Sequence, residues 1–304
     1  MTDKKTVNRS GALSRRDVLR MAVAGGVTGL AACAAPKLTS EPAPTTMPVV
    51  FISHGSPMVA LIKDDYSAAL KKMGEEFPLP KAIVVISAHW TAEAPIRVTG
   101  GERPETIYDF GGFPPELSQV KYPSPGHPNL AREVAETLTA AGMPAVLEDR
   151  GLDHGAWVPL RLSYPGADIP VLEVTLRWDF NPTDLVRLGK VLAPLRERGV
   201  LLIGSGGIVH NFGLMRKLAK GEKPDAWAVD FDTWIRDRVG TFDLESLVNY
   251  KKAHPGGEEA APTTEHFDPL FVVLGAARPG ERVVDVYEGF RGANLSMRTF
   301  ALRS

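Results

Sequence analysis

Three short apolar runs stand out along the chain because no polar residue interrupts them. They cover residues 49–52, 82–86 and 200–203 and are rich in β-branched side chains. A strand that is buried on one face alternates apolar and polar residues, whereas a strand inside a parallel sheet is covered on both faces and is apolar throughout. The pattern therefore predicts three strands of a parallel sheet.

Helical and strand-like segments alternate along the rest of the chain. The clearest helix covers 128–141, with Pro128 in its first turn and Gly142 just after its end, and Gly74 is placed to end a shorter helix over 66–73. Other helices are predicted over 181–198, over 226–239 and around His266, and other strands over 145–147, 170–176, 283–288 and 295–302. This order, without an internal repeat, predicts an α/β fold in which one domain, residues 48–304, has a mostly parallel central sheet flanked by helices.

A histidine follows each of the three apolar runs. His54 and His89 come soon after the first two runs, and His210 follows the third through a glycine-rich segment. The carboxyl ends of parallel strands lie at one edge of a sheet, where open α/β folds bind their ligands. Imidazole is the commonest protein ligand for transition metals. The sequence therefore predicts a metal site at the carboxyl ends of the strands.

Four other histidines complete the set of seven. His154 and His266 have glycine nearby or lie near a predicted helix start, and it is the joint pattern of five histidines that favours a metal site. His127 and His254 lie in a loop and a polar turn beside proline and glycine, so they are expected outside the site.

Residues 100–125 are dense in glycine, proline and aromatic residues and fit neither a helical nor a strand period. A long irregular segment inside a compact domain is often functional, so this one is expected either to wall a pocket or to be a surface loop. Trp90, Phe113 and Trp157 are candidates to line an aromatic pocket, and ordinary core packing is the alternative.

The composition narrows the classes of function. The 304 residues carry a formal net charge of -1, so there is no basic excess to neutralise phosphates and no nucleic-acid partner is expected. Cys33 is the only cysteine, which excludes an intrachain disulfide. The sequence also lacks the His-Glu-x-x-His motif of zinc proteases and the Gly-x-Ser-x-Gly motif of serine hydrolases.

The first 47 residues have the pattern of an export signal followed by a tether. Residues 14–20 resemble a twin-arginine signal, and the apolar run that follows is too short to span a membrane. Leu30-Ala31-Ala32-Cys33 resembles the lipobox of bacterial lipoproteins. We therefore expect a signal peptide over 1–32, a flexible tether over 33–47 and an exported protein of the periplasm or cell envelope. A lipidated Cys33 would be its membrane contact, and cleavage without lipidation is the alternative.

Six short motifs occur in a fixed order across the domain. They are His54-Gly55-Ser56-Pro57, Ser87-Ala88-His89-Trp90, Asp109-Phe110-Gly111-Gly112-Phe113-Pro114, Asp153-His154-Gly155-Ala156-Trp157, Val209-His210-Asn211 and Glu265-His266-Phe267. Together they resemble the class III extradiol ring-cleavage dioxygenase family, and within it the branch of the 4,5-DOPA dioxygenases. The resemblance covers the chain from about residue 48 to its end.

The resemblance implies a set of roles for the histidines. One divalent metal ion would be held by His54, His89 and His266, with His210 as a fourth ligand or a group just behind the ligands. His154 would be the acid/base residue, with His210 as the alternative. Members of the family bind both hydroxyls of a catechol to Fe(II), bind dioxygen beside it and cleave the ring next to the diol, and some members of the branch contain zinc. The expected partners are therefore a small aromatic diol and dioxygen.

The ligand set leaves the metal open between Fe(II) and Zn(II). Ring-cleaving iron enzymes commonly use two histidines and one carboxylate, whereas the third position here carries His266, with Glu265 beside it. An all-histidine set suits zinc at least as well as iron, and zinc has no redox chemistry. The main hypothesis is a dioxygenase. The alternatives are a zinc hydrolase, with His154 or His210 as its base, and a non-catalytic metal-binding protein.

Overall fold

The structure is a computed structural model that describes residues 46–304. The expected signal peptide over 1–32, the expected lipidation site Cys33 and all but the last two residues of the expected tether lie outside the described residues. Met47, at the end of that tether, is buried, and its backbone N–H donates to the carbonyl of Arg196. Met47 is therefore already packed into the folded domain.

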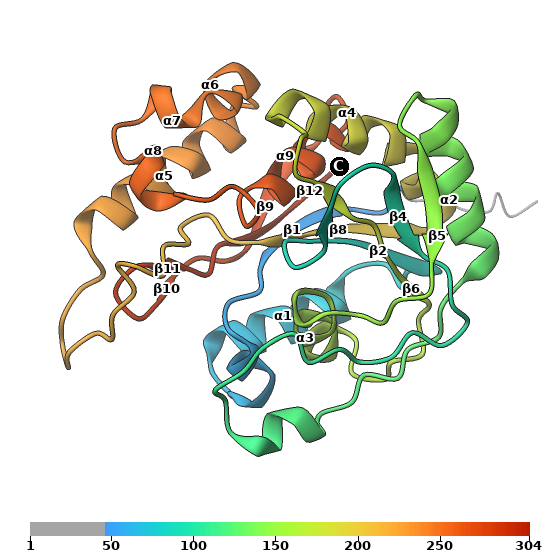
Figure 1. Cartoon of the computed structure of the whole chain (residues 1–304). Coiled ribbons are helices and arrows are strands. Elements are labelled where there is room, and N and C mark those ends of the chain that lie inside the picture. The colour runs from blue at the N-terminus through green and yellow to red at the C-terminus, as the bar shows by residue number, and fades with distance from the viewer. Residues whose placement is uncertain (1–45) are drawn as a thin grey trace, which may run out of the picture. The chain divides into compact units, whose positions relative to one another are not determined.

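A six-stranded sheet forms the centre of this domain (Figure 1). Its strands are, in spatial order, β6 (Val171–Glu173), β2 (Ala82–Ser87), β8 (Val200–Gly206), β1 (Val49–Ser53), β12 (Thr299–Arg303) and β9 (Arg282–Tyr287). The first four strands run parallel to one another, whereas β12 is antiparallel to both of its neighbours. The predicted α/β domain with a mostly parallel sheet is confirmed.

The sheet separates two apolar cores. Val49 and Phe51 of β1 contribute to one core, and Val50 and Ile52 contribute to the other, because successive side chains of a strand point to opposite faces. Each fully buried side chain of this size stabilises the fold by about 1.5–3 kcal/mol. Figure 1 shows α1 and α3 on one side of the sheet and α4 and α9 on the other. The helices of these layers are α1 (Asp65–Glu76), α3 (His154–Ser163), α2 (Pro128–Ala140), α4 (Pro182–Leu192) and α9 (Asp268–Gly275).

The remaining elements complete the domain. They are α5 (Ala226–Gly240), α6 (Leu244–Val248), α7 (Tyr250–Ala253), α8 (Gly257–Ala260), the strand pairs β3 (Thr91–Ala92) with β7 (Leu176–Arg177), β4 (Ile96–Thr99) with β5 (Ala145–Glu148) and β10 (Phe290–Arg291) with β11 (Leu295–Ser296), and 3₁₀ helices at Pro57–Leu61, Pro115–Gln119 and Ala193–Arg198. Residues 100–125 are otherwise mostly irregular, as predicted. Within residues 46–304, no helix combines the length and the apolar character that crossing a membrane requires.

Several predicted boundaries differ from the structure for identifiable reasons. Gly74 does not end its helix, because α1 continues to Glu76. A Cβ atom at Gly74 would lie 1.9 Å from the carbonyl oxygen of Ser163, so this glycine allows α1 to pack closely against α3. The predicted strands over 170–176 and 295–302 are each divided into two shorter strands. His266 lies in the turn before α9 and not within a helix.

Candidate active site

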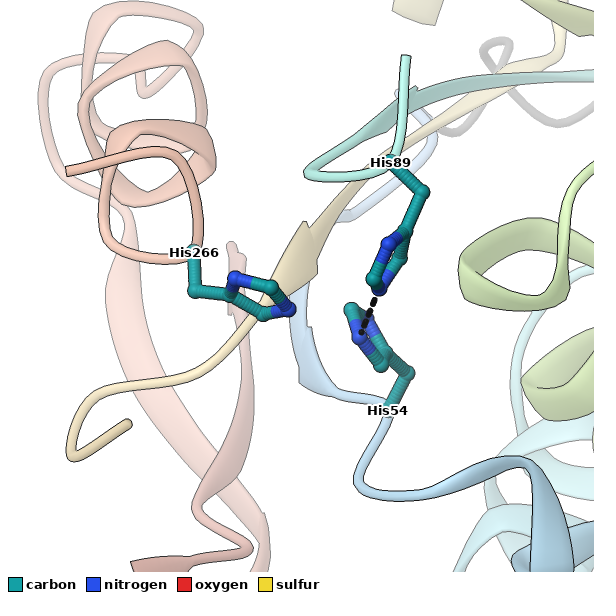
Figure 2. A group of neighbouring side chains, drawn as sticks. All are labelled: His54, His89 and His266. Carbon is teal, nitrogen blue, oxygen red and sulfur yellow. Dashed lines mark hydrogen bonds between the residues drawn. The ribbon is translucent and has the colours of Figure 1, made fainter. Parts of the chain in front are cut away.

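Three of the predicted histidines converge at the carboxyl edge of the sheet. His54 follows β1 and His89 follows β2, and these two strands lie on either side of β8. One ring nitrogen from each of His54, His89 and His266 lies within 4.8 Å of the other two. Figure 2 shows the three rings facing one another, with Nε2 of His54 3.0 Å from Nε2 of His89.

The glycine-rich end of β8 explains how His266 reaches this point. A Cβ atom at Gly206 would lie 2.0 Å from the carbonyl oxygen of His266, so only glycine lets that backbone come so close. The next N–H, from Gly207, donates to the same carbonyl at 2.8 Å. The glycines after the third apolar run therefore position a metal-site candidate that is about sixty residues away in the sequence.

Hydrogen bonds define which nitrogen of His54 and His266 is free. The hydroxyl of Ser205 donates to the carbonyl of Gly155 at 2.5 Å, so at 2.9 Å it accepts the proton of His54 Nδ1. Nδ1 of His266 lies 3.2 Å from a carboxylate oxygen of Glu265, which can only accept. In both neutral rings the proton is therefore on Nδ1, and Nε2 presents a lone pair to the centre of the site.

Burial keeps these imidazoles neutral. Desolvation lowers the pKa of His54 well below its usual value, lowers the pKa of His89 to about 3 and lowers that of His266 to about 4. The neighbouring imidazoles add to each shift because two positive charges at this distance would repel. Neutral imidazole is the form that binds a metal ion.

The donor set fits one divalent transition metal. The lone pair of His54 Nε2 faces His89 Nε2 at 3.0 Å, a contact that needs either a proton or a cation between the two atoms. Two nitrogens that each lie about 2.1 Å from one ion can be at most about 4.2 Å apart. The distance between the two rings is therefore compatible with two ligands of one ion.

His154 lies beside this group and is held by a carboxylate that the sequence reasoning missed. His154 is the first residue of α3, and its Nδ1 donates to Asp109 at 2.9 Å while its backbone N–H donates to the other carboxylate oxygen at 3.0 Å. The carboxylate of Asp109 also lies 3.7 Å from Nδ1 of His89. Although burial opposes the shift, the hydrogen bond from His154 lowers the pKa of Asp109. The sequence did contain a signal for Asp109, because this residue is the first of one of the six motifs.

His210 lies behind the three-histidine group. Its ring stacks flat on His266, with the centroids 3.5 Å apart and the planes 7° apart, and Phe212 contacts it edge to face. It forms a second close group with Glu265 and His266. Burial lowers the pKa of His210 to about 4. The structure thus brings His210 to the site, and its role as a ligand or as an acid/base residue stays a prediction.

The aromatic candidates divide into core and rim. Trp157 is fully buried and donates to the carbonyl of Ile107, and Trp90 is 6% exposed, so both pack as core residues. Phe113 is 36% exposed and contacts Phe110, whose ring lies 5.7 Å from that of His154. Residues 100–125 therefore do reach the site, through Asp109 and Phe110.

The two remaining histidines are used elsewhere in the fold. Nδ1 of His127 accepts the N–H of Leu130 and caps α2. His254 lies in the polar turn with its side chain buried, and its Nε2 lies 3.2 Å from a carboxylate oxygen of Asp230. Among residues 46–304, neither histidine belongs to a close group of metal-ligating side chains.

The fold and the site together define a candidate mononuclear metalloenzyme of the α/β class. The family model "Catalytic LigB subunit of aromatic ring-opening dioxygenase" matches residues 48–294. The chain therefore belongs to the LigB family of aromatic ring-opening dioxygenases. Members of this family use a metal ion, and the class acts on an aromatic substrate and dioxygen.

Individual relatives agree with this assignment. The chain is 40% identical to a 4,5-DOPA dioxygenase extradiol of Beta vulgaris, over 84% of this chain and 96% of the relative, and 38% identical to one of Escherichia coli (strain K12), over 83% and 93%. A crystal structure of an uncharacterized protein of Escherichia coli K12 matches with a TM-score of 0.72 and 35% identity, covering 84% of this chain and 99% of that one. The protein is thus an extradiol ring-cleaving dioxygenase.

Proposed function

We propose that the protein opens the ring of a DOPA-like catechol with dioxygen, at a single Fe(II) or Zn(II) ion held by His54, His89 and His266. The observation that carries the proposal is the convergence of three neutral imidazoles within 4.8 Å. The substrate class is supported by relatives that are named 4,5-DOPA dioxygenase extradiol and that match over nearly their whole length.

The metal would bind at the Nε2 atoms of the three histidines. When bound, Fe(II) supplies the redox chemistry with dioxygen and lowers the pKa of a catechol hydroxyl that it coordinates. Ser205 and Glu265 hold the Nδ1 protons of His54 and His266, so these two rings stay in the orientation and tautomer that a ligand needs.

His154 is the residue that we assign to proton transfer. Its Nδ1 proton is held by Asp109, so its Nε2 is free to accept a proton from a substrate hydroxyl and to return it later. The carboxylate of Asp109 stabilises the imidazolium that this transfer creates. His210 is the weaker candidate, because burial lowers its pKa to about 4 and it stacks on another imidazole.

Reconstitution with defined metals tests the proposal. The purified protein would be stripped of metal, loaded anaerobically with Fe(II) or Zn(II) and mixed with dioxygen and a panel of catechols that includes DOPA. We expect oxygen uptake and a ring-opened, coloured product in the Fe(II) form, and loss of both in His154→Ala. Turnover of the Zn(II) form without oxygen uptake would instead indicate a hydrolase, and tight zinc binding without turnover of either form would indicate a binding protein.

We further propose that residues 1–32 direct export and that Cys33 carries a lipid anchor in the cell envelope. The support is the order of a twin-arginine motif, a short apolar run and Leu30-Ala31-Ala32-Cys33. Mass spectrometry of the mature N-terminus tests this proposal. A diacylated or triacylated Cys33 in the wild type, and release of Cys33→Ser from the membrane fraction, are the expected results. A mature N-terminus at another residue would contradict them.

A further inference from the structure

A buried ionic network lies directly behind His89 and His154. The side chains of Asp153 and Glu173 are completely buried, and Arg150 links them through Nη1, at 3.3 Å from Asp153 and 2.9 Å from Glu173. The backbone N–H of Asp153 donates to the second oxygen of Glu173 at 2.8 Å. The guanidinium of Arg150 also lies over the ring of Trp90, 4.6 Å from its centroid.

The network has one connection to each of the two histidines. Ser87 at the end of β2 donates to Asp153 at 2.7 Å, and its hydroxyl accepts the backbone N–H of His89 at 3.2 Å. The same oxygen of Asp153 accepts the N–H of Ala156 at 3.3 Å, which caps the helix that begins with His154. One carboxylate thus joins the strand end that carries His89 to the helix that carries His154.

The two elements are also in direct contact at this point. A Cβ atom at Gly155 would lie 2.4 Å from the hydroxyl oxygen of Ser87, so the first turn of α3 lies against the end of β2. Burial, together with the neighbouring Asp153 carboxylate, raises the pKa of Glu173 well above its usual value. Arg150 supplies the cation that a buried pair of carboxylates needs, because it lies within ion-pair distance of both.

We propose that Arg150, Asp153 and Glu173 are positioning residues that hold His89 and His154 in one fixed relation. The proposal rests on the proposed function, in which His89 binds the metal and His154 transfers a proton. A buried ion pair is weak as a source of stability, because the loss of hydration opposes the attraction. Its role here is to fix geometry. Mutation of groups that orient metal ligands typically lowers metal affinity or activity by about 10–100-fold.

Two substitutions break the network at different links, and two others serve as matched controls. Ser87→Ala removes the link to His89, and Arg150→Lys shortens the cation that joins Asp153 to Glu173. Ser163→Ala removes a buried serine hydroxyl at the far end of the same helix, where it donates to Pro159. Arg196→Lys alters a completely buried arginine that pairs with Glu281 at the opposite edge of the sheet.

The readouts separate positioning from stability. For each full-length variant we would measure Zn(II) affinity by competition with a chelator, the midpoint of thermal unfolding without metal, and kcat and KM for catechol cleavage in the Fe(II) form. We expect Ser87→Ala and Arg150→Lys to weaken zinc binding about tenfold or more and to lower kcat more than they change KM. Ser163→Ala and Arg196→Lys should lower the unfolding midpoint and leave zinc affinity and kcat unchanged.

The outcomes distinguish this inference from the proposed function. Wild-type zinc affinity and kcat in both Ser87→Ala and Arg150→Lys would overturn the positioning role, and Ser87→Ala alone decides the matter if Arg150→Lys does not fold. If the wild type cleaves no catechol but the expected pattern of zinc affinities is found, the positioning network stands and the proposed reaction is wrong.

Discussion

Two buried polar clusters lie at opposite edges of the same parallel strands, and they differ in how completely they are satisfied. At the amino edge, the five N–H groups of Arg196 all find acceptors, namely both carboxylate oxygens of Glu281 and the carbonyls of Met47, Ala276 and Leu302. At the carboxyl edge, the Nδ1 atoms of His54, His154 and His266 are bonded. Within residues 46–304, Nε2 of His154 and of His266 has no hydrogen-bond partner.

The difference indicates what each cluster is for. A saturated buried cluster can only hold segments together, as Arg196 does for the start of the domain, the end of α9 and the last strand. A cluster that orients lone pairs towards one point, and bonds the other nitrogen in three of its rings, is incomplete without a ligand. The predictions below test this contrast between a structural cluster and a functional one.

The largest effect is expected from loss of a metal ligand. His89→Ala removes one of the three converging nitrogens. Loss of a group that only orients a metal ligand already lowers metal affinity or activity by about 10–100-fold. We therefore expect the loss of a ligand to lower metal affinity by more than about 100-fold. Ring cleavage should be lost with it. Chelator competition and an oxygen electrode measure the two effects. Unchanged affinity in His89→Ala would show that the ion binds elsewhere.

Asp109→Asn should affect catalysis more than metal binding. Asparagine has one acceptor oxygen in place of two, so it cannot accept both the Nδ1 proton and the backbone N–H of His154, and its neutral amide does not stabilise the charged ring. The kcat should therefore fall by about 10²- to 10⁴-fold. The variant His154→Ala gives the matched comparison. If the two residues act as a unit, the double variant is no slower than the slower single variant, and additive losses would contradict the pairing.

A substitution in the amino-edge cluster should change the stability of the protein but not its activity. Glu281→Ala leaves the guanidinium of Arg196 buried without its carboxylate, which typically costs about 3–5 kcal/mol in the free energy of unfolding. Urea denaturation measures that loss. The kcat of the folded, Fe(II)-loaded variant should equal that of the wild type, and a fall in kcat would show that the two edges are coupled.

The stability of the metal-free protein should depend on pH through the histidines. Burial lowers the pKa of His54, His89, His210 and His266, so below pH 6.5 the unfolded chain binds protons that the folded chain does not. Stability is therefore lost as pH falls below about 6.5 towards the folded pKa values, which are about 3 for His89 and about 4 for His210 and His266, by at most about 1.4 kcal/mol per pH unit for each histidine. Urea titrations at pH 7, 6 and 5 measure this slope. A flat profile would show that the rings are not held neutral, and bound zinc should steepen the loss because protons compete with the metal.

The smallest effect is expected at a histidine outside both clusters. His127→Ala removes the side chain that caps α2, and loss of a helix cap costs about 0.5–2 kcal/mol. Thermal unfolding should show a small decrease in the midpoint, while metal affinity and kcat stay at wild-type values. An effect of His127→Ala on metal binding would extend the site beyond the residues that the structure brings together.

Much of the sheet was predictable because its signal is local. The apolar runs that include Val84 and Leu202 are buried on both faces. A strand of this kind is recognisable from its own residues, because it is apolar throughout. The same logic placed His54 and His89 together, because the parallel strands of one sheet end at the same edge. Gly74 was misread for the opposite reason, since its role depends on a helix that is about ninety residues away in the sequence.

The sequence by itself determined the class of fold and the histidines that gather at the sheet edge, because strand ends and short motifs are properties of neighbouring residues. Only the tertiary structure decided which groups form hydrogen bonds with those histidines or stack on them. The partners Asp109 for His154, Ser205 for His54 and the stacked ring of His210 for His266 come from segments far apart in the chain. Their pairing depends on how loops and helices pack over the sheet, and no local pattern records that packing.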